Sequence, residues 1–326
     1  MDTKERILVL LRYLKEHTDE DTAVSNSDLR QMFREIGESV SLPTLRDDIA
    51  SLRRCGYDID VNEQNGVGTY YKFLSRDWSL PELQILIDAV SAGQFLTVDK
   101  TDKMIRKLRQ MAGPSERGEL KPSIMTDLRL KAPNEQILYI VQTIKDAMKN
   151  GYRISFIQDE YTPEMERVPK HGGCLYEVSP YAMIWERDRY YLVGWSEKHD
   201  AVANFRIDRM ELPEVVRKEA RPMPPDLHLE DYSGPIFKFF GGRKENVTLR
   251  FRPALMNSIV DRFGTGPEIR QTGEDTLETT VPVQLSPTFY AWLFQYAGSM
   301  TVSAPDCVCE EYAQRLRAAI DDLPGN

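Results

Sequence analysis

The stretch RDRYYLVGWSEKHDAVANFRIDRM, residues 187–210, decides the fold of the middle of this chain. It predicts two strands of mixed polarity joined by a polar turn. Side chains alternate between the two faces of a strand, so we expect Phe205 and Ile207 to share the core face and Arg206 and Asp208 to share the other. An arginine in such a position is either paired with a carboxylate or available to bind an anion.

The sequence on both sides of this stretch predicts a small β-domain. An apolar repeat of 3.6 residues in NEQILYIVQTIKDAMKNG predicts a helix that Asn134 caps and Gly151 ends. From Tyr152 the repeat falls to two residues, in YRISFIQ, LYEVSPYAMIWE, RYYLVGWS and VANFRIDRM. Short successive strands with a helix only ahead of them indicate a small Sm-like antiparallel barrel or sandwich over residues 134–218.

Residues 1–76 predict three short amphipathic helices followed by a hairpin. Ser25 and Asp28 suit a capping box at the second helix, Ser41 suits the N-cap of the third, and Gly56 suits its end. The segment EQNGVG predicts the turn of the hairpin. This order is typical of a winged helix-turn-helix, whose third helix would enter the major groove of DNA. A generic small domain or a dimerisation module would show the same pattern.

The remaining residues predict two linkers and a third domain. Residues 77–133 indicate a helical linker, and residues 219–240 a linker rich in proline and charge. Residues 241–326 alternate strand and helix, which predicts a compact α+β extension domain. The expected fold class is therefore multidomain α+β, with the winged helix-turn-helix, the helical linker, the small β-barrel or sandwich and the extension domain in that order.

Composition narrows the classes of function. The formal net charge of −9 argues against indiscriminate binding of polyanions. Residues 1–75 hold 10 Lys+Arg and 14 Asp+Glu, a balance of 10 − 14 = −4, so any DNA contact must be focused on a few cations. No apolar run reaches about 18 residues, so no membrane partner is expected. Four scattered cysteines indicate a reducing, cytoplasmic setting.

Enzymatic motifs are absent from the sequence. No nucleophile elbow, P-loop or dinucleotide fingerprint occurs, and the four histidines are widely scattered. A metal site needs three or four converging ligands, which the two separated groups of Cys and His do not offer. We therefore expect neither an enzyme nor a cofactor.

Taken in order, these features resemble the WYL-domain transcriptional regulators of bacteria. The family takes its name from a Trp-Tyr-Leu triplet, which reads Tyr190-Tyr191-Leu192 here, so the tryptophan is replaced. The family pattern Phe-Arg-aliphatic-Asp-Arg matches residues 205–209 in full, and SPYAMIWERDR resembles the Pro-Tyr strand before it. SLPTLRDDIASLRRCGYDI resembles the recognition helix of the family, with the Arg-Asp pair one place earlier or replaced by two aspartates. VTLRFRPALMNSIVDRFG resembles the start of its C-terminal extension.

The resemblance implies a DNA-binding regulator, which we expect to be a repressor, that senses a negatively charged ligand such as a nucleotide or nucleic acid. Planar guanidinium groups suit phosphate, and an exposed tyrosine could stack a base. The candidate ligand-binding residues are Ser179, Tyr181, Tyr190, Tyr191, Arg206, Asp208 and Arg209. The alternative for Arg206 and Asp208 is a structural ion pair, and for the tyrosines it is half-buried packing.

The resemblance also directs attention to the third helix and the hairpin. The candidate DNA-binding residues are Ser41, Thr44, Arg46, Arg53, Arg54, Asn65, Tyr70 and Lys72. Arg46 is the candidate base reader, with guanine its natural partner. Asp47 and Asp48 would repel phosphate unless one of them pins a neighbouring arginine.

Useful specificity implies a homodimer on a palindromic double-stranded operator, because one such domain reads few base pairs. The rival hypothesis is an adaptor that senses nucleotides or nucleic acid through protein partners and does not bind operator DNA. Neighbouring phage-defence or DNA-repair genes would indicate which signal is sensed.

Overall fold

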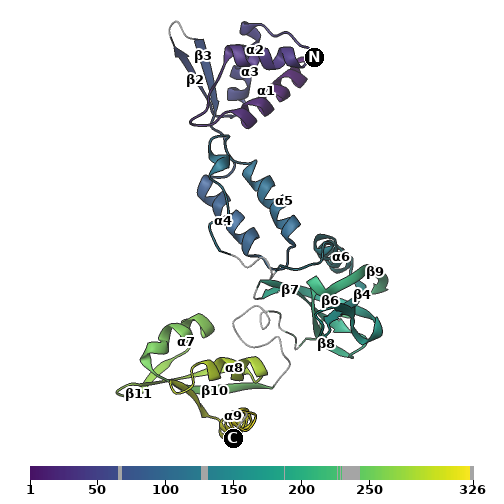
Figure 1. Ribbon diagram of the computed structural model, residues 1–326, viewed down its shortest axis with the longest axis vertical. Coiled ribbons are helices and arrows are strands. Elements are labelled where there is room, and N and C mark those ends of the chain that lie inside the picture. The colour runs from purple at the N-terminus through teal and green to yellow at the C-terminus, as the bar shows by residue number, and fades with distance from the viewer. Residues whose placement is uncertain are drawn as a thin grey trace. The chain divides into compact units, whose positions relative to one another are not determined.

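The computed structural model describes residues 1–64, 68–125, 131–186, 188–225, 227, 229 and 243–323. The chain divides into two compact units, Met1–Val141 and Gln142–Asn326. Both units combine helices with antiparallel sheet (Figure 1), which confirms the α+β class. No helix in these described ranges is both long enough and apolar enough to cross a bilayer.

Three helices and a three-stranded antiparallel sheet form the start of the first unit. The elements are α1 (Thr3–His17), β1 (Val24–Ser25), α2 (Asn26–Glu35), α3 (Leu42–Arg54), β2 (Ile59–Gln64) and β3 (Gly68–Phe73). The strands lie in the order β1-β3-β2, so the short β1 adds a strand that the sequence did not predict. Fully buried side chains from all three helices and the hairpin, among them Leu14, Phe33, Leu45 and Phe73, form one core. The predicted order of three helices and a hairpin is thus present.

Side-chain caps determine where α2 and α3 begin. Asp28 N donates to Ser25 Oγ at 3.2 Å and Ser25 N donates to Asp28 Oδ2 at 2.8 Å, which is the predicted capping box. At α3, Thr44 N donates to Ser41 Oγ at 3.3 Å. Such caps stabilise a helix by about 1 kcal/mol each. Gly56 has a φ of +95°, a conformation that glycine adopts without strain, so α3 ends just before it.

A helical pair, α4 (Leu80–Ala92) and α5 (Val98–Arg109), follows and is joined to the first helices through Asp19. Asp19 is 5% exposed. Its Oδ2 accepts hydrogen bonds from Ser115 N at 2.7 Å and Ser115 Oγ at 2.6 Å, and its Oδ1 accepts one from Thr22 N at 2.7 Å. A Cβ at Gly113 would lie 2.5 Å from the Asp19 side chain, so this close approach requires glycine. We call this set of contacts the Asp19 junction.

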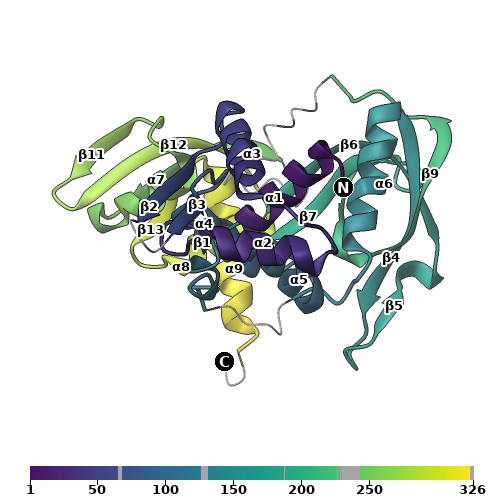
Figure 2. The same ribbon diagram turned by 90° about the horizontal axis from the view of Figure 1, so that it is seen from above.

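The central part contains one helix and a six-stranded sheet. The elements are α6 (Ile137–Asn150), β4 (Tyr152–Tyr161), β5 (Arg167–Pro169), the 3-10 turn η3 (Lys170–Gly172), β6 (Leu175–Glu186), β7 (Arg189–Ser196), β8 (Ala201–Arg206), the 3-10 turn η4 (Ile207–Arg209) and β9 (Met210–Glu219). The strand order is β5-β4-β6-β7-β8, and β9 pairs with β4. The turn η4 therefore carries the chain from the β8 edge back to β4. Helix α6 runs beside β4 and β9 (Figure 2).

The prediction that VANFRIDRM forms one continuous strand is wrong. Strand β8 ends at Arg206, and Ile207–Arg209 form a 3-10 turn. Regular alternation stops there, so Ile207 and Asp208 are both buried, with exposed fractions of 0% and 4%. The physical reason is the Asp208 carboxylate, which two arginines hold inside the domain.

The C-terminal part is a four-stranded antiparallel sheet with three helices. The elements are β10 (Lys244–Phe251), the 3-10 turn η6 (Pro253–Leu255), α7 (Met256–Phe263), β11 (Ile269–Gly273), β12 (Thr276–Gln284), α8 (Pro287–Gln295), β13 (Met300–Ala304) and α9 (Asp306–Asp321). The strand order is β11-β12-β10-β13, with β11 an edge strand that the sequence did not predict. One core joins Leu249 of β10 to Ile259, Phe289 and Val308 of the three helices.

Candidate ligand site and candidate nucleic-acid interface

A pocket of about 300 Å³ opens where β8 passes into η4 and meets β4. Its volume lies at the lower end of the range for small-molecule sites. Its walls come from β4, η3, β6, the β7–β8 turn, β8 and η4, and the lining residues are Gln158, Asp159, Glu160, Lys170, Tyr176, His199, Ala203, Asn204, Phe205, Arg206 and Arg209.

Arg206 lines the pocket, and two hydrogen bonds to the Asp208 carboxylate fix the orientation of its guanidinium group. Arg206 Nε and Nη2 donate to the two carboxylate oxygens of Asp208 at 3.1 and 2.7 Å. Arg189 Nη1 donates to Asp208 Oδ2 at 3.1 Å, so one buried carboxylate holds two guanidinium groups. Burial alone would lower the pKa of Arg206, but the hydrogen bonds and charge of Asp208 raise it above its usual value. Burial lowers the pKa of Arg189, against the opposing effect of Asp208. The cluster keeps an excess positive charge beside the pocket.

Arg209 and Lys170 are the cations of the pocket without a carboxylate partner among the described residues. The Nε of Arg209 is buried and makes no hydrogen bond within the part of the chain that the structure describes. Its guanidinium carbon lies 5.7 Å from the centre of the Tyr161 ring, a cation–π distance. A buried donor without a partner costs about 1–3 kcal/mol.

The carboxylate of Asp159 also faces the pocket but is largely neutralised. Arg167 Nε donates to Asp159 Oδ2 at 2.5 Å, and Arg167 Nη2 donates to Glu211 Oε1 at 2.8 Å. Asp159 Oδ1 and Gln158 Oε1 remain buried acceptors without a partner among the described residues. The pocket lining thus holds two cations without a carboxylate partner, and two of its residues carry buried acceptor atoms without a partner among the described residues.

Aromatic rings form another wall of the pocket. Phe205 lies edge-on to Tyr176 at 5.4 Å between ring centroids, and the exposed His199 stacks on Phe205 at 6.5 Å. Lys198 Nζ lies 4.7 Å from the centre of the Tyr176 ring. Flat side chains beside free cations offer a surface on which a planar ring could stack.

The other predicted ligand residues lie outside this pocket. Ser179 is fully buried and accepts a hydrogen bond from Arg221 N at 2.9 Å. Tyr181 Oη donates to Pro222 O at 3.1 Å. Tyr190 packs against Trp185 with ring centroids 4.9 Å apart, and Tyr191 lies opposite Arg206 in the β7–β8 ladder. The structure therefore brings together Arg206, Asp208 and Arg209 of the predicted set.

Sequence reasoning missed several residues of this site. Arg189 and Tyr191 are two residues apart on β7, so their side chains point to the same face of the sheet. Tyr191 lies opposite Arg206 on β8, and this register could have indicated that Arg189 lies near Arg206. His199 lies in the polar turn of the stretch that decided the fold. Lys170, Gln158 and Asp159 come from β4 and η3, and no local pattern connects them to residues 187–210.

The exposed side of α3 is the candidate nucleic-acid interface. Arg46, Arg53 and Arg54 are exposed, and Arg54 Nη2 donates to Ser51 Oγ at 2.8 Å. The hydroxyls of Ser41 and Thr44 lie 2.7 Å apart at the N-terminus of the helix. These five predicted residues lie on one helix, three of them as exposed guanidinium groups.

Asp48 does not compete with this surface, because it points into the domain. It is 3% exposed, and Arg6 Nε and Nη2 donate to its two oxygens at 2.6 and 3.0 Å. The arginine that Asp48 binds is thus Arg6 of α1, and not a neighbour on α3. Only Asp47 of the two neighbouring aspartates is exposed.

The hairpin contributes less than predicted. Lys72 Nζ donates to the backbone oxygen of Glu20, so its ammonium group is already engaged. Tyr70 is half-buried and lies opposite Asn62 and Ser25 in the sheet. Asn65 lies outside the described residues.

Two family models match the chain. Residues 139–215 match the WYL domain, and residues 243–320 match the WCX domain. The first match contains β4 to η4 and thus every residue of the pocket, and the second runs from β10 to Ile320 in the last turn of α9.

Comparison with solved structures gives several remote similarities, of which two follow. The first is proteasome accessory factor B/C (PafBC) of Arthrobacter aurescens, with 16% identity, a TM-score of 0.27, and coverage of 99% of this chain and 48% of that one. This chain thus spans about half the length of that protein. The second is a CRISPR Cas-related protein, with 14% identity, a TM-score of 0.37, and coverage of 98% and 83%. Neither similarity is high enough to transfer a role. No curated protein matches the chain.

Proposed function

We propose that this chain is a DNA-binding transcriptional repressor whose affinity for a double-stranded operator is set by a nucleotide or nucleic-acid ligand. The ligand binds in the pocket of the WYL domain, and residues 1–76 act as a winged helix-turn-helix. A homodimer on a palindromic site supplies the specificity that one reading head lacks.

The observation that carries the ligand half of the proposal is the Arg209 guanidinium, which lines the pocket with a buried Nε and no carboxylate partner among the described residues. Lys170 supports it from η3, and Asp208 fixes Arg206 alongside. Guanidinium groups bind phosphate through charge-assisted hydrogen bonds. The free acceptors Gln158 Oε1 and Asp159 Oδ1 suit the amino group of a base.

The DNA half rests on α3 and its surroundings. Three exposed arginines lie on this helix, and the Arg6–Asp48 pair removes one negative charge from its outer side. The positive end of the helix dipole lies at Ser41, where backbone N–H groups favour phosphate.

An electrophoretic shift assay on the DNA upstream of the chain's own gene tests the DNA half. We expect retarded DNA that higher salt releases, because phosphate contacts displace counterions. Arg46→Ala should weaken binding about 10-fold or more if Arg46 reads a base. Arg106→Ala, which removes an exposed arginine from α5, is the matched control and should change affinity less than about 2-fold. Equal effects of the two substitutions would contradict a reading role for α3.

The second candidate function is an adaptor without operator binding. The negative balance of residues 1–75, 10 − 14 = −4, favours it. Absence of any shift at low salt, with the dimer intact in sedimentation, would support the adaptor and refute the repressor.

A further inference from the structure

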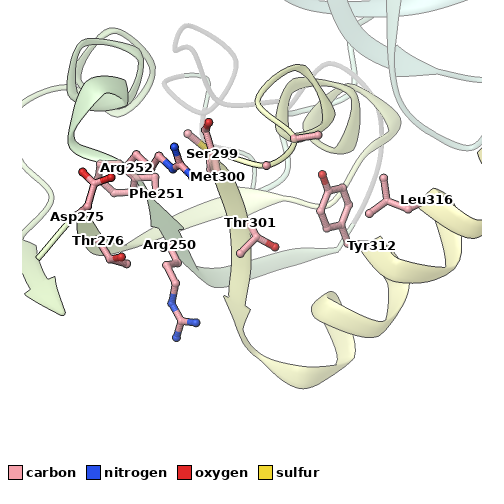
Figure 3. A pocket seen from close by; sticks show the side chains of 12 residues that line it. Arg250, Phe251, Arg252, Asp275, Thr276, Ser299, Met300, Thr301, Tyr312 and Leu316 are labelled. Atoms are coloured by element: carbon pink, nitrogen blue, oxygen red, sulfur yellow. The ribbon is translucent and has the colours of Figure 1, made fainter. Parts of the chain in front are cut away.

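A second pocket, of about 330 Å³, lies in the C-terminal domain at one end of three neighbouring strands. The start of β12, the end of β10 and the start of β13 form its floor, and α9 forms a wall (Figure 3). Figure 3 places Asp275 and Thr276 on the β12 side and Tyr312 and Leu316 on the α9 side. The loop of Ala297 to Ser299 completes the lining.

Two arginines line this pocket, Arg250 in β10 and Arg252 directly after it. Arg250 Nε donates to Glu278 Oε1 at 2.8 Å, which neutralises that guanidinium. Arg252 is exposed, and its side chain has no carboxylate partner among the described residues. Asp275 is the acidic residue of the lining, and among the described residues it forms no ion pair with Arg252, so the Arg252 guanidinium remains available to an anion. The backbone of Arg252 is fixed by its N–H, which donates to Ser299 O at 3.0 Å.

The other lining residues are apolar or carry hydroxyls. Phe251, Met300 and Tyr312 have exposed fractions of 2%, 4% and 6%, so each turns only a small part of its surface to the pocket. Leu316 extends the apolar wall along α9. Hydroxyl groups of Ser299 and Thr301 lie between this wall and the arginines and can donate to an anion. Apolar walls with a few placed polar groups are what small-molecule sites share.

We propose that the C-terminal domain binds a small phosphomonoester with a flat apolar body in this pocket. The phosphate lies against Arg252 and the hydroxyls, and the ring lies against Met300, Tyr312 and Leu316. This site is separate from the WYL pocket, and no family match assigns it. The chain then has a binding site for a second ligand within residues 243–320.

Phenyl phosphate is the probe, and methionine methyl groups report which site it occupies. In full-length protein labelled with [13C-methyl]methionine, the Met300 resonance reports on the C-terminal pocket and is assigned through Met300→Leu. Met210 follows Arg209 and is fully buried in the WYL domain, so its resonance reports on the other pocket. We expect phenyl phosphate to shift the Met300 resonance in a saturable way. Inorganic phosphate and benzyl alcohol, which each carry half of the recognised chemistry, should require higher concentrations.

Arg252→Gln is the decisive variant and Arg270→Gln its matched control. Arg270 is an exposed arginine of β11 that pairs with Glu268 and lies outside the pocket lining. Arg252→Gln should raise the dissociation constant measured at Met300 about 10-fold or more, whereas Arg270→Gln should leave it within about 2-fold. The absence of a saturable Met300 shift in the unaltered protein would overturn the proposal, as would equal effects of the two substitutions. A shift of Met210 alone would overturn this site while leaving the proposed function intact.

Discussion

The Asp19 junction yields a prediction whose size follows from the geometry. Burial on its own would raise the pKa of Asp19, but hydrogen bonds from the side chain and backbone of Ser115 and from the backbone of Thr22 and Asp21 lower it from 3.8 to about 2. A fall of that size corresponds to about 2.4 kcal/mol, or about 60-fold in an equilibrium constant. Asp19→Asn removes the charge and places an N–H group against donors, so the junction should open more often by about that factor.

Hydrogen–deuterium exchange measures this opening in the full chain. The amides of Thr22 and Ser115 donate directly to Asp19, and their protection at neutral pH should fall up to about 60-fold in Asp19→Asn. Asp21→Asn is the matched control, because Asp21 is exposed and its side chain makes no described bond. Unchanged protection in Asp19→Asn would refute the reasoning.

The same junction predicts a dependence on pH. The folded pKa of Asp19 is lowered, so the ionised carboxylate stabilises the junction fully at pH values above the unfolded pKa of 3.8. That contribution is lost as the pH falls from about 4 through about 2. Protection of the two amides, corrected for intrinsic exchange, should therefore decline in that window in the unaltered protein and stay flat in Asp19→Asn.

Two further substitutions test the packing of the domains. Arg6→Met leaves the buried Asp48 carboxylate unpaired and should lower the free energy of unfolding by about 3 kcal/mol, measured by urea unfolding followed by circular dichroism. Arg6→Met/Asp48→Leu should recover most of that loss, and a double variant as unstable as the single one would contradict the account. Gly194→Ala should cost about 2 kcal/mol by the same measurement, because a Cβ there overlaps the backbone oxygen of Ser179 and the side chain of Val178. Gly266→Ala, where the Cβ meets open space, should be within about 0.5 kcal/mol of the unaltered protein.

The sequence predicted those helices whose caps and apolar repeats lie within one short segment of the chain. The capping box at Ser25 and the N-cap at Ser41 are present as expected, and the apolar repeats of the first three helices face one core. The strands β1 and β5 escaped prediction because they have two and three residues, too few to show a repeat. Their identity depends on the partner strand.

The candidate site was predicted in part for the same physical reason. Arg206, Asp208 and Arg209 are neighbours in sequence, so their convergence needs only a tight turn. Ser179 and Tyr181 have the right chemistry, but the chain after β9 takes up their hydrogen bonds. Lys170, His199 and Tyr176 reach the pocket through the pairing of β4 with β5 and β6 and of β7 with β8, which single-sequence patterns do not specify.

The central claim is that the free Arg209 guanidinium in the pocket of the WYL domain binds phosphate. Fluorescence anisotropy with a labelled single-stranded oligonucleotide tests it most directly. Arg209→Gln should raise the dissociation constant about 10-fold or more, since it removes a charge-assisted contact from the pocket. Arg217→Gln removes the same charge from an exposed position on β9 outside the pocket lining and should change it less than about 2-fold. Equal effects of the two substitutions, or no binding by the unaltered protein at low salt, would contradict the claim.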